Sequence, residues 1–151
     1  MIEGSDQHLI LLPELRRQIE AEGAAAYPNE CCGMMLGRDV LEHGVKLRRV
    51  QKLVAGTNTF SADEQYHRFS IDPLQQLKVE KEAEKEGLML VGYYHSHPDH
   101  PARPSEYDRQ HAWPFYSYVI IAIEKAKPAE MTSWVLNEES EQFAVQSIRS
   151  E

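Results

Sequence analysis

Cysteine is nearly absent from this sequence of 151 residues: Cys31 and Cys32 are the only two, and they are adjacent. A disulfide between neighbouring residues is strained, because its geometry needs a separation that they rarely reach. We therefore expect a reducing compartment and no disulfide that staples the fold. The pair is also badly spaced for a structural zinc finger, whose cysteines usually lie about two to four residues apart. We interpret both thiols as buried apolar side chains.

Long apolar runs and an excess of positive charge are absent as well. No segment approaches the roughly 20 apolar residues that a membrane-spanning helix needs, and the N-terminus lacks the basic region of a signal peptide. The 24 acidic side chains outnumber the 16 basic ones, which gives a net charge of −8. This charge argues against nucleic acid as a partner, since phosphate backbones are bound by basic surfaces. We expect a cytoplasmic protein with no nucleic-acid or membrane partner.

The sequence is typical of one globular domain. Residues 1–151 are enough to bury a sound core, 42% of them are apolar, and no internal repeat or low-complexity linker divides them. We therefore predict a single domain over residues 1–151.

Apolar patterns and turn residues predict about three helices and about seven strands in mixed order. The helices are expected over residues 12–27, over 72–87, and from Ser105 onward. The strands are expected over residues 31–38, 45–54, 66–71, 88–97, 116–124, 131–138 and 142–148. The core is expected to include Leu74, Leu77, Val79, Trp113, Tyr116, Tyr118 and Trp134. This order of elements predicts an α/β fold with a strongly curved mixed sheet.

The stretch YYHSHPDHPARPSEYD, residues 93–108, contains the strongest sign of chemistry. His95 and His97 lie at the end of an expected strand, where side chains at i and i+2 point to the same face. Both imidazoles can therefore reach one metal at about 2.0–2.1 Å. A helix that begins at Ser105 places Asp108 on its first turn, where its carboxylate can be a third ligand. Two nitrogens, one oxygen and a fourth position left for water are typical of a catalytic zinc site.

Water at such a site needs a group that takes up and delivers its proton. Glu30, in YPNECCG, lies between an expected helix and an expected buried strand, where an acid has little structural reason to be. We predict that Glu30 is the general base. The hydroxyl of Ser105 is a candidate donor to the water or to the tetrahedral oxyanion. The alternative for Ser105 is that it serves only as the N-cap of the following helix.

An upstream glutamate, then His-Ser-His, seven residues, Ser, two residues and Asp resembles the signature of the JAMM (MPN-plus) zinc metalloproteases. The segment PNECCGMMLG also resembles the first motif of that family. The resemblance covers roughly residues 9–148 and is greatest to the small stand-alone bacterial and archaeal members. It implies an MPN/JAMM-like, cytidine-deaminase-like sandwich and one Zn²⁺ per chain. The roles it implies are zinc ligands at His95, His97 and Asp108, a general acid/base at Glu30, and a transition-state donor at Ser105.

The resemblance further implies hydrolysis of an amide bond at the C-terminal tail of a ubiquitin-like protein. The only long polar loop lies at about residues 55–65, so we expect little surface for gripping a second folded protein. The hypothesis is therefore a short adduct, such as cysteine, released from a ubiquitin-like sulfur carrier. The resemblance to small bacterial members linked with cysteine biosynthesis implies the same. The tail is expected to lie extended along Tyr66, Phe69 and Ile71. The alternatives are a non-catalytic MPN scaffold and a deubiquitinase-like protease.

Overall fold

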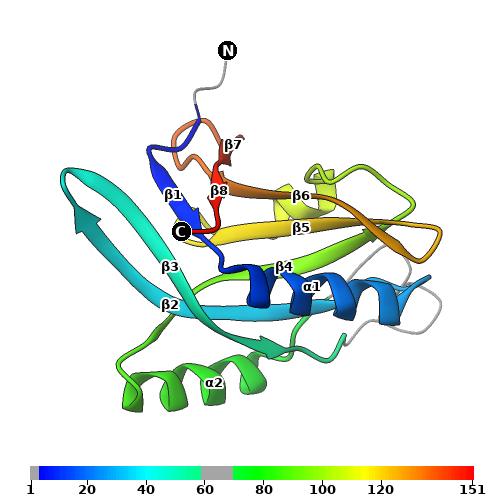
Figure 1. The fold of residues 1–151 in the computed structure, drawn as a ribbon, viewed down its shortest axis with the longest axis horizontal. Helices are drawn as coiled ribbons and strands as arrows, with labels where there is room; N and C mark the ends of the chain where they lie inside the picture. The colour runs from blue at the N-terminus through cyan, green and yellow to red at the C-terminus, as the bar shows by residue number, and fades with distance from the viewer. Residues whose placement is uncertain (1–3, 59–69) are drawn as a thin grey trace.

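The computed structural model describes residues 4–58 and 70–151, which form one strongly curved mixed sheet with three helices beside it (Figure 1). The elements in chain order are β1 (Gln7–Ile10), α1 (Pro13–Ala26), β2 (Cys32–Glu42), β3 (Val45–Ala55), α2 (Pro73–Lys85), β4 (Met89–Pro98), α3 (Glu106–Gln110), β5 (Ser117–Glu124), β6 (Lys127–Leu136), β7 (Phe143–Gln146) and β8 (Ile148–Arg149). The predicted α/β class and curved mixed sheet are confirmed.

The sheet has eight strands in the order β7-β6-β5-β4-β2-β3-β1-β8. Strand β4 pairs parallel with β5 and antiparallel with β2, so it lies in the middle of the sheet. The two ends of the sheet curl toward each other, and they meet where the backbone N–H of Ser5, just before β1, donates to the carbonyl of Val145 in β7 at 2.8 Å. The result is a nearly closed barrel whose central strand ends in the predicted metal-binding motif.

The strand count differs from the prediction because short strands depend on partners that are distant in sequence. Strand β1 was not predicted, and it forms by pairing with β3 and β8. The segment predicted over 142–148 is divided into β7 and β8. Of the strand predicted over 66–71, residues 66–69 lie outside the described residues, and Ser70 and Ile71 are not in a strand.

The core lies on both faces of the sheet, because successive side chains of a strand point to opposite sides. On one face Met35 packs in the cluster that contains Ile19 of α1. On the other face Met34 and Leu36 pack in the cluster that contains Val79 of α2. The two long helices therefore cover opposite faces of the same strands.

Three predicted core residues are wrong. Leu74 is 74% exposed and Leu77 is 48% exposed, because α2 contributes only Val79 and Ala83 to the buried surface. Trp113 is 67% exposed, since it lies on the connection between α3 and β5, outside the sheet.

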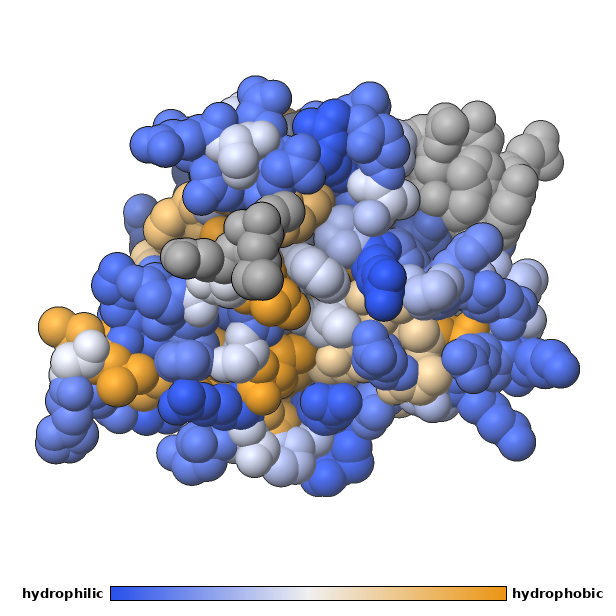
Figure 2. All heavy atoms as spheres, turned by 90° about the horizontal axis from the view of Figure 1, so that it is seen from above, coloured by the Kyte–Doolittle hydropathy of each residue, from blue (hydrophilic) through white to orange (hydrophobic). Residues whose placement is uncertain are grey.

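The face seen from above is mostly polar (Figure 2). Figure 2 shows hydrophilic side chains over most of the face seen from above, with apolar ones in scattered patches. No helix in residues 4–58 or 70–151 combines the length and the apolar character that crossing a bilayer would need.

A close contact between β2 and β4 needs a glycine. Gly33 lies opposite Tyr94, and a Cβ atom at position 33 would lie 2.1 Å from Cζ of the tyrosine ring. The ring cannot move aside easily, because Tyr94 is fully buried and its hydroxyl donates to Glu22 at 2.7 Å. Tyr94 directly precedes His95 in β4.

We expect Gly33→Ala to lower the free energy of unfolding by about 1–3 kcal/mol or more, because overpacking forces the Tyr94 ring or the strands apart. Urea denaturation of the metal-free protein measures the effect. The control is Gly4→Ala, where the nearest atom to the new Cβ is a carbonyl oxygen at 3.3 Å. A Gly33→Ala variant as stable as the parent protein would show that the Gly33 contact is not tight.

Candidate metal centre

Three side-chain atoms converge at the end of β4. His95 is 1% exposed and His97 is 8% exposed, and their Nε2 atoms lie 3.1 Å apart. Oδ2 of Asp108, on α3, lies 3.4 Å from Nε2 of His95 and 3.3 Å from Nε2 of His97. The three residues that the motif predicts as ligands are therefore brought together from a central strand and the helix that follows it.

The spacing of these atoms fits one zinc ion. Ligand atoms at about 2.0–2.1 Å from a tetrahedral metal lie roughly 3.3–3.4 Å from one another. Nδ1–H of His97 donates to the carbonyl of Pro101 at 2.9 Å, which leaves the lone pair of Nε2 directed at the centre. This lone pair faces the Asp108 carboxylate, so a cation or a proton between them is needed to offset the repulsion.

Glu30 is the fourth group at the centre and is only 6% exposed. Its carboxylate and the ligand atoms of His95 and His97 all lie within 4.8 Å of one another, a grouping that is also capable of holding a metal. The carboxylates of Glu30 and Asp108 therefore both lie close to the same two histidines. The 3.3–3.4 Å separations of Asp108 match a tetrahedral face, which favours Asp108 as the ligand and leaves Glu30 beside it.

The two carboxylates have opposite electrostatic environments. Burial raises the pKa of Glu30 to about 7, although the nearby His95 acts to lower it. Burial also acts to raise the pKa of Asp108, but the charge of His95 and the hydrogen bonds from both histidines outweigh it and lower the pKa below its ordinary value. A carboxyl group whose pKa lies near neutral pH is suited to proton transfer, and one whose pKa is lowered is suited to be a metal ligand.

Ser105 forms a capping box with Asp108 at the start of α3. Its hydroxyl accepts the backbone N–H of Asp108 at 3.0 Å, and its own backbone N–H donates to Oδ2 of Asp108 at 2.8 Å. The N-cap role weighed from sequence is therefore confirmed, and it orients the carboxylate toward the histidines. The additional role of the hydroxyl as a transition-state donor stays a prediction.

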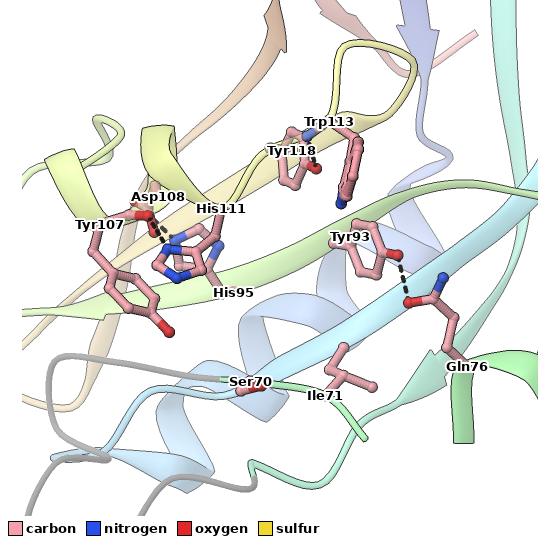
Figure 3. A pocket seen from close by; sticks show the side chains of 10 residues that line it. All are labelled: Ser70, Ile71, Gln76, Tyr93, His95, Tyr107, Asp108, His111, Trp113 and Tyr118. Carbon is pink, nitrogen blue, oxygen red and sulfur yellow. Dashed lines mark hydrogen bonds and ion pairs between the residues drawn. The ribbon is translucent and has the colours of Figure 1, made fainter. Parts of the chain in front are cut away.

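A cavity of about 260 Å³ opens beside the centre (Figure 3). Its walls come from β4, α2 and the segment before α2, and from α3, β5 and the connection between them. The lining residues are Ser70, Ile71, Gln76, Tyr93, His95, Tyr107, Asp108, His111, Trp113 and Tyr118. Of the predicted substrate-binding residues, Ile71 lines this cavity, whereas Tyr66 and Phe69 lie outside the described residues.

Comparison with known protein families identifies the family of this chain. The family described as prokaryotic homologs of the JAB domain matches residues 12–137. The chain belongs to this family. The resemblance to the small stand-alone prokaryotic JAMM proteins, predicted from the motif, is thereby confirmed.

Curated relatives of this JAB-family chain are named for cleavage reactions. A desampylase from Haloferax volcanii is 33% identical over 101 residues, which are 66% of this chain and 67% of the relative. A protein from Thermus thermophilus, named a probable TtuB-protein conjugate cleaving protease, is 36% identical over 110 residues, 73% of this chain and 64% of the relative. The matches thus span about two thirds of these relatives' own length.

Solved structures extend the similarity to almost the whole chain. A solution structure of a protein from Desulfitobacterium hafniense has a TM-score of 0.76 and 31% identity, and covers 93% of this chain and 90% of that one. A solution structure of a protein from Salinibacter ruber has a TM-score of 0.69 and 35% identity, with coverage of 95% and 91%.

The sequence analysis did not identify two residues that hold the metal centre together, Ser96 and Pro101. Ser96 is fully buried, its hydroxyl accepts the backbone N–H of Cys31 at 2.8 Å, and its own N–H donates to the carbonyl of Cys31 at 3.2 Å. It thereby fixes the segment that carries Glu30 against the strand that carries the histidines. Pro101 orients His97 through its carbonyl. Alternation along β4 predicts that Ser96 faces away from the histidines, but not which backbone it meets.

We expect purified protein to contain about one zinc ion per chain, and His97→Ala to lose most of it, because two ligands hold zinc far less tightly than three. Elemental analysis after gel filtration measures the content. The control is His43→Asn, which removes an exposed histidine from a turn whose positive φ asparagine tolerates. Full zinc content in His97→Ala would contradict the ligand set.

Proposed function

We propose that this protein is a zinc-dependent isopeptidase that hydrolyses an amide bond at the C-terminal tail of a ubiquitin-like protein. One observation carries the proposal: Nε2 of His95, Nε2 of His97 and Oδ2 of Asp108 are spaced for one zinc, and a second buried carboxylate, Glu30, lies beside them. Family membership and the names of the curated relatives support the same reaction class.

Each residue of the site has its own role in the proposed hydrolysis. When bound, zinc acts as a Lewis acid that polarises the carbonyl of the scissile bond and lowers the pKa of water. Glu30 accepts the proton of the attacking water and delivers it to the leaving amine nitrogen. The Ser105 hydroxyl donates a hydrogen bond to the oxyanion, while its backbone N–H continues to hold Asp108. The capping box keeps the Ser105 hydroxyl and the Asp108 carboxylate together at the start of α3.

The tail of the ubiquitin-like protein is proposed to lie in the cavity beside the centre. Ile71 lines one wall and Trp113 another, so an extended, narrow peptide fits between them (Figure 3). The identity of the leaving amine separates two hypotheses. The name of the Thermus thermophilus relative favours protein conjugates, whereas the hypothesis made from the sequence is a cysteine or another short adduct on a sulfur carrier. The non-catalytic scaffold is disfavoured because the full donor set and the second carboxylate are both present.

We expect Glu30→Gln to retain zinc and to lose turnover by roughly 10²-fold or more, because glutamine keeps the shape and hydrogen bonds but cannot accept a proton. Single-turnover cleavage and zinc content are measured on the same preparation. The matched control is Glu20→Gln, which changes an acid on α1 whose partner, Arg16, lies at the surface. Normal turnover in Glu30→Gln would place the base elsewhere.

The leaving group is tested with two substrates that share one carrier protein ending in a glycine pair. One carries a single cysteine on the terminal glycine, and the other joins that glycine to a lysine of a second protein. We expect intact-mass analysis to show metal-dependent release in at least one case, blocked by a zinc chelator and by Glu30→Gln. Faster release of cysteine supports the short-adduct hypothesis, and cleavage of only the lysine conjugate contradicts it. Cleavage of neither substrate by zinc-loaded protein would overturn the proposed function.

A further inference from the structure

The proline-rich connection between β4 and α3 contacts the metal centre through one backbone carbonyl. Pro101 accepts Nδ1–H of His97 at 2.9 Å and the backbone N–H of Arg103 at 2.8 Å. The first bond decides which nitrogen of His97 keeps its lone pair for a metal. The direction of this carbonyl therefore matters for zinc affinity, and it depends on what holds the neighbouring peptide unit.

Thr132, on β6, holds that peptide unit from the other side. Its hydroxyl donates to the carbonyl of Ala102 at 2.6 Å, and its Oγ1 accepts the indole N–H of Trp134 at 2.8 Å. Because the indole can only donate, the single hydroxyl proton of Thr132 is directed at Ala102. The side chain of Ala102 is buried against Ile120 and Ala122, so the residue is held at both its side chain and its carbonyl.

We propose that Thr132 is a positioning residue for the metal centre. Through Ala102 it holds the Pro101 carbonyl against His97, keeps the Nε2 lone pair directed at the centre, and so raises the affinity for zinc. The indole of Trp134 donates to Thr132, which donates to the carbonyl of Ala102. The adjacent peptide unit carries the Pro101 carbonyl, which accepts from His97. This role rests on the proposed function, because it presumes a zinc ion at His97.

The next residue of the same strand supplies a matched control. Ser133 points to the opposite face, and its hydroxyl donates to Oε1 of Gln146 at 2.8 Å. Both residues of this pair are buried. Ser133→Ala therefore removes a buried hydroxyl and its hydrogen bond one residue from Thr132, with no connection to the proline-rich loop among the contacts described for Ser133.

The test compares zinc affinity, measured by competition with a chromophoric chelator, with the melting temperature of the metal-free protein. Thr132→Val keeps the shape and removes the hydroxyl. We expect it to bind zinc roughly tenfold more weakly, at the lower end of the loss seen when outer partners of a ligand are removed. Thr132→Ser should stay within about twofold of the parent, because it keeps the donor. Ser133→Ala should melt at a lower temperature and bind zinc as the parent does.

Parental zinc affinity in Thr132→Val overturns the inference while leaving the proposed function intact. An equal loss of affinity in Ser133→Ala also overturns it, because the effect would then come from general destabilisation. If Thr132→Val does not fold, Thr132→Ser and Thr132→Ala are compared, since both lack the methyl group and only one keeps the hydroxyl. Equal affinity of that pair contradicts the role. A parent protein that binds no zinc overturns the proposed function and the inference together.

Discussion

Three candidate ligand atoms that face one another across 3.1–3.4 Å impose the constraint on which the rest of the structure depends. Two imidazole nitrogens and a carboxylate oxygen at these distances in a buried space need a proton or a metal cation among them to offset their repulsion. Proteins tolerate such an arrangement where it is held by surrounding structure and serves a site. Here the histidines come from the central strand β4, which has hydrogen-bonded neighbours on both sides. The fold therefore brings together three atoms that are suited to bind one metal ion.

The surrounding contacts fix segments that are distant in sequence against β4. Ser96 joins the backbone of Cys31, and thus the Glu30 segment, to the strand between the two histidines. The Tyr27 hydroxyl donates to Asp99, so the same segment is tied a second time, just beyond Pro98. The capping box of Ser105 holds Asp108 from the other side. Glu30 and Asp108 can then lie near the same histidines and still differ in pKa, which is the arrangement that separates a proton carrier from a ligand.

Local signals made much of this predictable. Alternation along β4 places His95 and His97 on one face, the N-cap serine sets the position of Asp108, and Asp72 with Pro73 predicts the start of α2. The errors come from features with no local signal. Strand β1 exists only because β3 and β8 pair with it, and Trp113 is exposed because the α3–β5 connection runs outside the sheet. The partner of the Ser96 hydroxyl lies 65 positions away in sequence, so no pattern along the chain could reveal it.

The central claim is that two imidazoles and the Asp108 carboxylate hold one zinc, while the neighbouring thiols do not. X-ray absorption at the zinc edge of the purified protein tests this most directly, because it separates nitrogen and oxygen ligands from sulfur by distance. The account predicts only nitrogen and oxygen neighbours at about 2.0–2.1 Å, with the multiple-scattering pattern of two histidines. A sulfur neighbour at about 2.3 Å would instead assign the metal to Cys31 or Cys32, and would contradict the account.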